Sequence, residues 1–357
     1  MLKDALANLD NRFIYNFQTE LGFSRAILFG AGGRGLSALQ FLKERGVEVL
    51  YFVDNGEDKW GSEFCGLPVH APEKILESPD VPVIVSSNYY EEIVNQLSQM
   101  GVTNYFYNFR GVSKNYRHDL IERNMAGIES VYASLADDQS RECYASVIKM
   151  FREGDEGYLR SCDYPIYEHP AVLPQPGDVI ADVGAFDGDT AFVFDAMCGG
   201  DCHIFCFEPS SENYDALQQN IYLKDTQDRM TPIKMGLWDS MEELAFCQDA
   251  GEPASNSVGQ GDSSIFAMEL DRFAEQKKSA INFIKMDIEG AEPNALRGAA
   301  EVIKRDKPDL QICLYHSPEH LWEIPLFIHS LVPEYTFYIG HHGIIRTDTV
   351  LYATCRG

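Results

Sequence analysis

The sequence of 357 residues predicts an α/β protein in which a smaller Rossmann-like domain, a helical connector and a larger Rossmann-like domain follow one another. Three observations predict this fold. Short apolar runs alternate with helical patterns in the first and last parts of the chain, the stretch between them has helical spacing only, and the last two strand-like runs lie very close together. The predicted boundaries are 1–112 for the first domain, 113–165 for the connector and 166–357 for the second domain.

The first domain is predicted from four apolar runs of strand length that are separated by amphipathic helical patterns. The expected strands are 25–30, 47–53, 81–87 and 104–109, and the expected helices are 36–45, 71–76 and 90–100. Alternating strands and helices are typical of parallel βαβ units. A small doubly wound domain is therefore expected.

The connector carries apolar residues at helical spacing from Leu120 to Tyr132 and again from Cys143 to Phe151. Asp138 or Ser140 is the expected cap of its second helix. Because no Gly/Ser-rich stretch interrupts the connector, we expect the two domains not to swing freely.

The second domain begins after a turn at Pro174–Gly177. Its expected strands are 178–183, 203–207, 231–235, 281–286, 310–315, 335–339 and 345–352. Only residues 340–343 separate the last two, which is too short for a parallel crossover, so a hairpin with one reversed strand is expected. Residues 251–264 are expected to be a polar loop.

Composition restricts the partners. The formal net charge of −26 disfavours nucleic acid and anionic membrane surfaces. No run approaches the roughly 20 apolar residues of a membrane helix, and the amino terminus lacks the apolar core of a secretory signal. The nine cysteines are scattered and mostly apolar in their surroundings, so a cytoplasmic location is expected.

The segment after the first strand of the second domain carries the strongest ligand-binding pattern. Two glycines follow the strand, where they permit a sharp turn and a close backbone approach to a ligand. Carboxylates would repel a pyrophosphate but suit the ammonium and sulfonium groups of S-adenosylmethionine, so this cofactor is predicted in preference to NAD. The predicted contacts are Asp182, Gly184, Asp187, Gly188, Asp189 and Thr190.

Further cofactor contacts are expected at the ends of the following strands. Glu208 closes the next strand and is placed to accept hydrogen bonds from ribose hydroxyls. Leu237 is expected to flank the adenine, and Asp287 follows the fourth strand beside the cofactor.

Several segments closely resemble the FkbM family of methyltransferases. They are ADVGAFDGDT, FCFEPSSENYDAL, INFIKMDIEGAEPNALRGA and CLYHSPEHLWEIPLFIHSLVPEY, and the resemblance covers about residues 115–353. It implies a Rossmann-like methyltransferase fold and O-methylation of a hydroxyl on a sugar, a nucleotide-sugar or a secondary metabolite. Relatives often carry an Arg before the final histidines, where this sequence has Gly340.

A hydroxyl acceptor must lose a proton, which calls for a base or a Lewis acid. His316 is the first choice for the base because an unperturbed imidazole titrates near neutrality. Asp287 is expected to orient the cofactor or the acceptor, and Glu289 is the third catalytic candidate. These three side chains could also hold a divalent cation, but no ligand spacing demands one and no metal is predicted.

The first domain has a ligand-binding pattern of its own. Gly30, Gly32 and Gly35 fit the dinucleotide fingerprint between a strand and a helix, and Asp54 ends the next strand at the ribose position. The continuation through Gly66-Leu67-Pro68-Val69 resembles the small domain that precedes many sugar-modifying transferases, which implies a nucleotide or nucleotide-sugar there.

Two alternatives to a methyltransferase stay open. One is an NAD-dependent oxidoreductase or epimerase working from the first domain, although no Tyr–Lys or Cys/His arrangement follows that domain. The other is a non-catalytic nucleotide-binding protein. The sequence does not decide between a monomer and a homo-oligomer.

Overall fold

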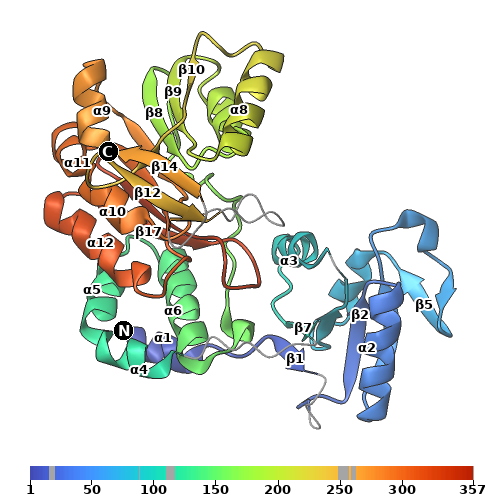
Figure 1. Ribbon diagram of the computed structural model, residues 1–357. Helices are drawn as coiled ribbons and strands as arrows, with labels where there is room; N and C mark the ends of the chain where they lie inside the picture. The colour runs from blue at the N-terminus through green and yellow to red at the C-terminus, as the bar shows by residue number, and fades with distance from the viewer. Residues whose placement is uncertain (16–20, 88, 110–116, 248–256, 259–262, 357) are drawn as a thin grey trace.

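A computed structural model describes the chain except for residues 16–20, 88, 110–116, 248–256, 259–262 and 357 (Figure 1). The described residues form two seven-stranded sheets and one four-stranded sheet. The first large sheet lies to the right in Figure 1, and the other two lie together with most of the helices to the left.

The first sheet has the strand order β1-β7-β6-β2-β3-β5-β4, and every neighbouring pair except β4 with β5 is parallel. Its strands are β1 (Phe13–Tyr15), β2 (Arg25–Phe29), β3 (Glu48–Val53), β4 (Glu63–Phe64), β5 (Leu67–His70), β6 (Val83–Val85) and β7 (Tyr105–Phe109). The helical elements are α2 (Gly33–Glu44), η1 (Glu57–Lys59), η2 (Pro72–Glu77) and α3 (Tyr90–Gln99).

The four predicted strands of this sheet are present, and three short strands were not predicted. β1, β4 and β5 span four residues or fewer. Pro68 inside β5 has no backbone N–H, which weakens any strand prediction at that position. Strands this short carry too little apolar periodicity to be recognised from the sequence.

The connector helices pack onto the second half of the chain. They are α4 (His118–Arg123), α5 (Met125–Ser134) and α6 (Asp138–Glu153), preceded in sequence by α1 (Leu2–Asn8) and followed by η3 (Glu156–Tyr158). Tyr144 of α6 is fully buried and donates a hydrogen bond to the carbonyl of Leu321, 3.1 Å away. Asp137 caps α6 by accepting from the amide of Ser140, so the cap is one residue before the predicted Asp138.

The second large sheet has the order β10-β9-β8-β15-β16-β18-β17, and only β18 runs against its neighbours. This confirms the mostly parallel sheet that ends in a hairpin. Its strands are β8 (Asp178–Val183), β9 (Cys202–Phe207), β10 (Met230–Ile233), β15 (Phe283–Met286), β16 (Asp309–Cys313), β17 (Thr336–His341) and β18 (Thr349–Thr354). The accompanying helices are α7 (Asp189–Met197), α8 (Ser211–Leu223), α9 (Leu270–Lys277), α10 (Glu292–Arg297), α11 (Ala300–Asp306) and α12 (His320–Leu331).

The four-stranded sheet was not predicted. It has the order β11-β14-β12-β13, with β11 (Gly236–Leu237), β12 (Glu242–Cys247), β13 (Ser257–Val258) and β14 (Ser263–Met268). The expected polar loop is therefore wrong at residues 257–258 and 263–264, and the rest of 251–262 lies outside the described residues. β12 and β14 expose one face, so their glutamates and serines concealed the strand periodicity.

One side chain from the second half of the chain is part of the core of the first sheet. Ile344, in the connection between β17 and β18, is buried among residues that include Ile93 and Val94 of α3. Beside it, Val94 and Asn95 line a cavity of about 220 Å³ together with Cys162 and His342. In the part of the chain that the structure describes, no helix has the length and apolarity needed to cross a bilayer.

Candidate functional site

A cavity of about 230 Å³ opens at the carboxyl ends of β8, β9 and β15. Ligands of open parallel sheets bind at this edge. Among the predicted site residues, seven line the cavity: Gly184, Asp189, Thr190, Glu208, Leu237, Asp287 and Glu289. The four-stranded sheet forms another wall through Leu244, Phe246, Val258, Ile265 and Ala267.

The loop after β8 requires glycine at two positions. Gly184 has φ +78°, and a Cβ there would lie 1.9 Å from the carbonyl oxygen of Asp287. Gly188 has φ +95° and begins α7, and its Cβ would lie 2.9 Å from Leu217. The loop can therefore pass close over β15 only with these glycines, which brings its backbone to the cavity.

Glu208 follows β9 and faces the cavity, although its residue surface is only 5% exposed. Its Oε2 accepts a hydrogen bond from the amide of Phe186 (3.0 Å), and its Oε1 accepts from the amide of Ser210 (2.9 Å). Burial raises the pKa of this carboxyl to about 7, against the opposing effect of the two amides. The side chain of Asn213 is a third hydrogen-bond donor to this carboxylate, so about one of its four accepting positions is left for a ligand.

Asp182 lies elsewhere than predicted. It is fully buried beneath the loop and outside the cavity lining, 3.1 Å from Nζ of Lys285. Lys285 also donates to the carbonyl of Gly184 at 2.7 Å. Burial alone would lower the pKa of Lys285, but Asp182 and Asp287 raise it above its usual value. Asp182 therefore supports the loop through a lysine, and its charge is not available to a cationic ligand.

Two other predicted contacts also lie behind the cavity lining. The side chain of Asp187 accepts from the amide of Asp189 at 3.3 Å, and its carbonyl accepts from Asn220 at 2.9 Å. Gly188 packs against Leu217 and Phe192 rather than lining the cavity. Both residues shape the turn that carries Asp189 and Thr190.

Asp287, directly after β15, is held by two tyrosines. Tyr167 donates to its Oδ2 at 2.9 Å, and Tyr315 donates to its Oδ1 at 3.0 Å. Burial raises the pKa of both phenols above their usual value, so they remain donors. The carboxylate of Asp287 is thereby fixed in orientation at the cavity wall.

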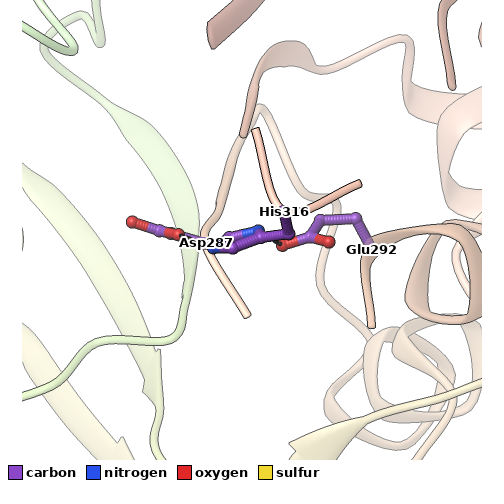
Figure 2. A group of neighbouring side chains, drawn as sticks. All are labelled: Asp287, Glu292 and His316. Carbon is purple, nitrogen blue, oxygen red and sulfur yellow. Dashed lines mark ion pairs between the residues drawn. The ribbon is translucent and has the colours of Figure 1, made fainter. Parts of the chain in front are cut away.

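His316 lies between carboxylates (Figure 2). Its Nδ1 is 2.8 Å from Oε1 of the fully buried Glu292, and its Nε2 is 3.4 Å from Asp287 and 3.5 Å from Glu289. Burial alone would lower the pKa of His316, but Glu289, Glu292 and Asp287 raise it to about 10. The carboxylates on both sides of the ring therefore favour the imidazolium form of His316, which has no free lone pair to act as a base, whereas a pKa near neutrality was expected from the sequence.

Ligand-type atoms of Asp287, Glu292 and His316 lie within 4.8 Å of one another. Asp287 and Glu292 approach opposite nitrogens of the same ring, as Figure 2 shows. Glu292 also accepts from the amide of Ile288 at 2.9 Å. This geometry is that of an imidazolium fixed between two anions, and its positive charge offsets one of the two carboxylate charges.

A second cavity, of about 530 Å³, lies at the carboxyl ends of β2, β3 and β6. Three of the residues predicted to bind a ligand in the first domain line this cavity, namely Gly30, Gly32 and Asp54. Gly35 does not line it and packs against the protein backbone, where a Cβ would lie 2.0 Å from the carbonyl oxygen of Gly30. Asp54 is engaged by the protein: it accepts from the amides of Ala31 (2.7 Å) and Gly56 (2.9 Å) and from Nζ of Lys59 (2.9 Å).

Sequence reasoning missed Tyr167, Lys285, Glu292 as the partner of His316, and the wall formed by the four-stranded sheet. A single lysine inside the apolar run Phe283-Ile-Lys-Met286 indicates a buried ion pair and could have directed attention to Asp182. Tyr167 comes from a loop 120 residues before its partner Asp287, and no local pattern connects the two.

Two parts of the chain are similar to known protein families. Residues 182–339 match the family model described as a methyltransferase FkbM domain, and residues 22–106 match the one described as C2185-like, N-terminal. None of the curated proteins compared with the chain matches it.

Among solved structures, methyltransferase FkbM from Methylobacillus flagellatus KT matches over 99% of this chain and 92% of its own, with 21% identity and a TM-score of 0.58. Aeropyrum pernix fibrillarin with natively bound S-adenosyl-L-methionine matches over 51% of this chain and 69% of its own, with 14% identity and a TM-score of 0.31. A SAM-dependent methyltransferase from Aquifex aeolicus matches over 51% and 84%, with 14% identity and a TM-score of 0.32.

The family match covers the loop after β8, Glu208 and the Asp287–Glu292 segment, all of which border the same cavity. Residues 182–339 are therefore a methyltransferase FkbM domain, which supports methyl transfer as the activity of this part of the chain.

Proposed function

We propose that the protein is an S-adenosylmethionine-dependent O-methyltransferase that acts on a hydroxyl of a small molecule, namely a sugar, a nucleotide-sugar or a secondary metabolite. The observation that carries this proposal is the Glu208 carboxylate, which faces the same cavity as the glycine-containing loop after β8. The proposed units are 1–112, the connector 113–165 and the catalytic unit 166–357, in the cytoplasm.

The residues around the cavity fit the methyl donor. Because a Cβ at Gly184 would overlap the carbonyl of Asp287, glycine lets this loop lie directly against the end of β15, where the cavity opens. Glu208 accepts a backbone amide on each oxygen and a hydrogen bond from the side chain of Asn213, and its remaining accepting position suits a ribose hydroxyl. S-adenosylmethionine, when bound there, supplies an electrophilic methyl group.

Glu289 is the proposed proton acceptor for the hydroxyl. It lines the cavity, its side chain is 27% exposed, and it has φ +53°, a strained conformation for a residue other than glycine. Glu289 lines the cavity together with Asp287. Asp287 accepts a hydrogen bond from the acceptor and orients it, because its own orientation is fixed by Tyr167 and Tyr315.

His316 is proposed as a positioning residue rather than the base. Its positive charge holds Asp287 and Glu289 near each other, and Glu292 fixes the ring from the opposite side. Three carboxylates without this cation would repel one another and separate. Several closely spaced acceptors at one wall suit a polyhydroxylated substrate.

Titration calorimetry of the full chain with S-adenosylmethionine and S-adenosylhomocysteine tests the cofactor assignment. We expect both to bind, with Kd values in the micromolar range of about 1–100 μM. Methyl transfer from tritiated donor to a panel of sugars, nucleotide-sugars and hydroxylated metabolites then tests the acceptor class. The absence of heat with either nucleoside would contradict the proposal.

Glu289→Gln is the variant that tests the proton acceptor. With an acceptor from the panel, we expect kcat to fall about 100-fold, since general base catalysis contributes that order, while the Kd of S-adenosylhomocysteine stays unchanged. Glu323→Gln, an exposed position on α12, is the matched control and should leave both quantities unchanged. An unaltered kcat in Glu289→Gln would remove Glu289 from this role.

A further inference from the structure

Two buried cysteines that the methyl-donor site does not use are in contact beside the cavity of about 220 Å³. Cys143 lies on α6 and is 1% exposed, and Cys162 follows η3 and is 4% exposed. The thiol of Cys143 donates a hydrogen bond to the sulfur of Cys162, and both cysteines are free of disulfides. The two sulfurs are therefore neighbours that oxidation can join.

His342 is a further hydrogen-bond donor to the sulfur of Cys162. Its Nδ1 is 3.1 Å from that sulfur and 3.1 Å from the carbonyl oxygen of Tyr164. Because a carbonyl only accepts, the hydrogen-bond network assigns a proton to Nδ1. On the other side of the ring, Nε2 is 2.9 Å from the hydroxyl of Tyr352, which already accepts from the amide of Tyr167 and donates its own proton to Nε2. This chain of hydrogen bonds fixes the imidazole with its N–H toward Cys162.

The donors around Cys162 favour its thiolate form. Hydrogen bonds from Cys143, from His342 and from the side chain of Tyr164 lower the pKa of Cys162 well below its usual value, although burial opposes them. The carbonyl oxygen of His341, 3.2 Å from the sulfur, also opposes the charge but is outnumbered by these donors. The hydrogen bond to Cys162 and burial raise the pKa of Cys143. The pair thus consists of a nucleophilic thiolate and a protonated thiol.

The cavity gives a small reactant access to one sulfur of the pair. Cys162 lines it together with His342, whereas Cys143 does not belong to the lining. The volume of about 220 Å³ is far above the roughly 15 Å³ that a water molecule needs, so a molecule as small as hydrogen peroxide fits. The accessible cysteine is therefore the ionised one.

A second pair of neighbouring cysteines provides an internal comparison. Cys198, at the end of α7, and Cys202, the first residue of β9, are also in hydrogen-bond contact. Here the nearby group is the carboxylate of Asp195, 3.8 Å from the sulfur of Cys202, and burial raises the pKa of both thiols. A buried pair of cysteines is thus not reactive by proximity alone, and the donors around Cys162 make the difference.

We propose that Cys162 and Cys143 form a peroxide-reactive dithiol site. The Cys162 thiolate attacks one oxygen of hydrogen peroxide, the O–O bond breaks, hydroxide leaves, and Cys162 becomes a sulfenic acid. The sulfur of Cys143 then attacks that of Cys162, the S–O bond breaks, and the hydroxyl leaves with the Cys143 proton as water. Peroxide gains the two electrons that the cysteines lose in forming the disulfide. The inference goes beyond the proposed O-methylation and does not depend on it.

Peptide mapping of the full chain by mass spectrometry tests the site. The protein is exposed to hydrogen peroxide at pH 6, its remaining thiols are alkylated, and it is digested without reductant. At this pH only about 1 in 300 ordinary thiols is ionised. We expect a Cys143–Cys162 disulfide that dithiothreitol reverses and that forms at least tenfold faster than any oxidation of Cys198, Cys202 or the exposed Cys65.

Two variants follow the individual steps. Cys143→Ser removes the second thiol, so the sulfenic acid should persist at Cys162 and be trapped by dimedone. His342→Gln removes the imidazole and should slow the oxidation of Cys162 at least tenfold, whereas His329→Gln, exposed on α12, should leave the rate unchanged.

Three outcomes would overturn the inference. The first is the absence of a Cys143–Cys162 disulfide in the parent protein, a measurement that needs no variant to fold. The second is oxidation of Cys198 and Cys202 as fast as that of Cys162. The third is an unaltered rate in His342→Gln, which would show that the imidazole does not activate the thiol.

Discussion

The two cavities of this protein are built from the same parts and differ in how their acidic residue is used. In each, a glycine-containing loop follows a central parallel strand, and a carboxylate follows the neighbouring strand. Glu208 is held by two amides and retains accepting capacity toward its cavity. Asp54 accepts from two amides and a lysine and has become part of the scaffold.

The difference teaches that the position of an acid in a Rossmann-like motif does not define its role. Asp54 is at the residue where a ribose-binding acid is expected, yet its partners make it structural. Glu208 occupies the corresponding place in the other domain and faces the ligand space. The kind of partner separates the two cases, because a lysine ammonium pairs with Asp54 whereas two amides and the side chain of Asn213, all neutral, hold Glu208. The substitutions below test that separation.

The largest effect is expected from Gly184→Ala. The new Cβ would lie 1.9 Å from the carbonyl oxygen of Asp287 at a residue with φ +78°, so the loop must move. We expect the free energy of unfolding to fall by about 3 kcal/mol and binding of S-adenosylhomocysteine to be lost. Urea unfolding and calorimetry measure the two quantities. The glycine control is Gly33→Ala, whose Cβ meets open space; equal stability losses in the two variants would contradict the contrast between the loops.

A smaller effect is expected from Glu208→Gln. One amide donor of the backbone would face the new NH2 group, and charge-assisted hydrogen bonds to the ligand would be lost. The expected weakening of S-adenosylhomocysteine binding is about 30-fold, or about 2 kcal/mol. Glu212→Gln, exposed on α8, is the control and should bind normally.

The pH dependence of ligand affinity also tests the role of Glu208. Because the pKa of Glu208 is raised to about 7, the carboxyl loses its proton as pH rises through 7, and the ionised form is the better acceptor. The affinity of the parent protein for S-adenosylhomocysteine should therefore increase about tenfold from pH 6 to pH 8. Glu208→Gln should show no such increase. A parent protein whose affinity is flat over this range would show that Glu208 does not contact the ligand.

The smallest effect on ligand binding is expected from Asp54→Asn. If Asp54 is part of the scaffold, the Kd of the nucleotide expected there from the sequence, with ADP and UDP as probes, should change by less than about threefold, while stability falls by about 1 kcal/mol through the weakened contact with Lys59. Calorimetry and thermal unfolding measure both. A loss of affinity beyond tenfold, with stability unchanged, would restore Asp54 as a ribose ligand and remove the contrast with Glu208.

The local sequence pattern was sufficient to predict a strand where that strand is buried on both faces. Asp178–Val183 is predicted and found over the same residues, because a strand buried on both faces is mostly apolar, as Val179, Ile180, Ala181 and Val183 are here. The final hairpin also follows from chain length alone, since a parallel crossover needs a dozen residues or more. The four-stranded sheet could not be found this way, because β12 and β14 are each exposed on one face and mix polar with apolar residues there.

The candidate site was predictable in position and less so in detail. The carboxyl ends of parallel strands meet at one edge, so Gly184, Glu208 and Asp287 could be placed together from the sequence. The charge state of His316 depends on Glu292 and Glu289, and Asp182 depends on Lys285. Such pairings are set by side-chain directions in the folded protein, which the spacing of residues does not contain.

Helix α3 has a consequence for how the two ligands relate. Glu92 and Ile93 line the first-domain cavity, while Val94 and Asn95 line the small cavity beside His342, and Ile344 packs against the same helix. The helix is therefore a shared wall between the two halves of the chain. If a ligand of the first-domain cavity moves α3 and thereby raises the affinity for the methyl donor by some factor, thermodynamic linkage requires the donor to raise the affinity for that ligand by the same factor.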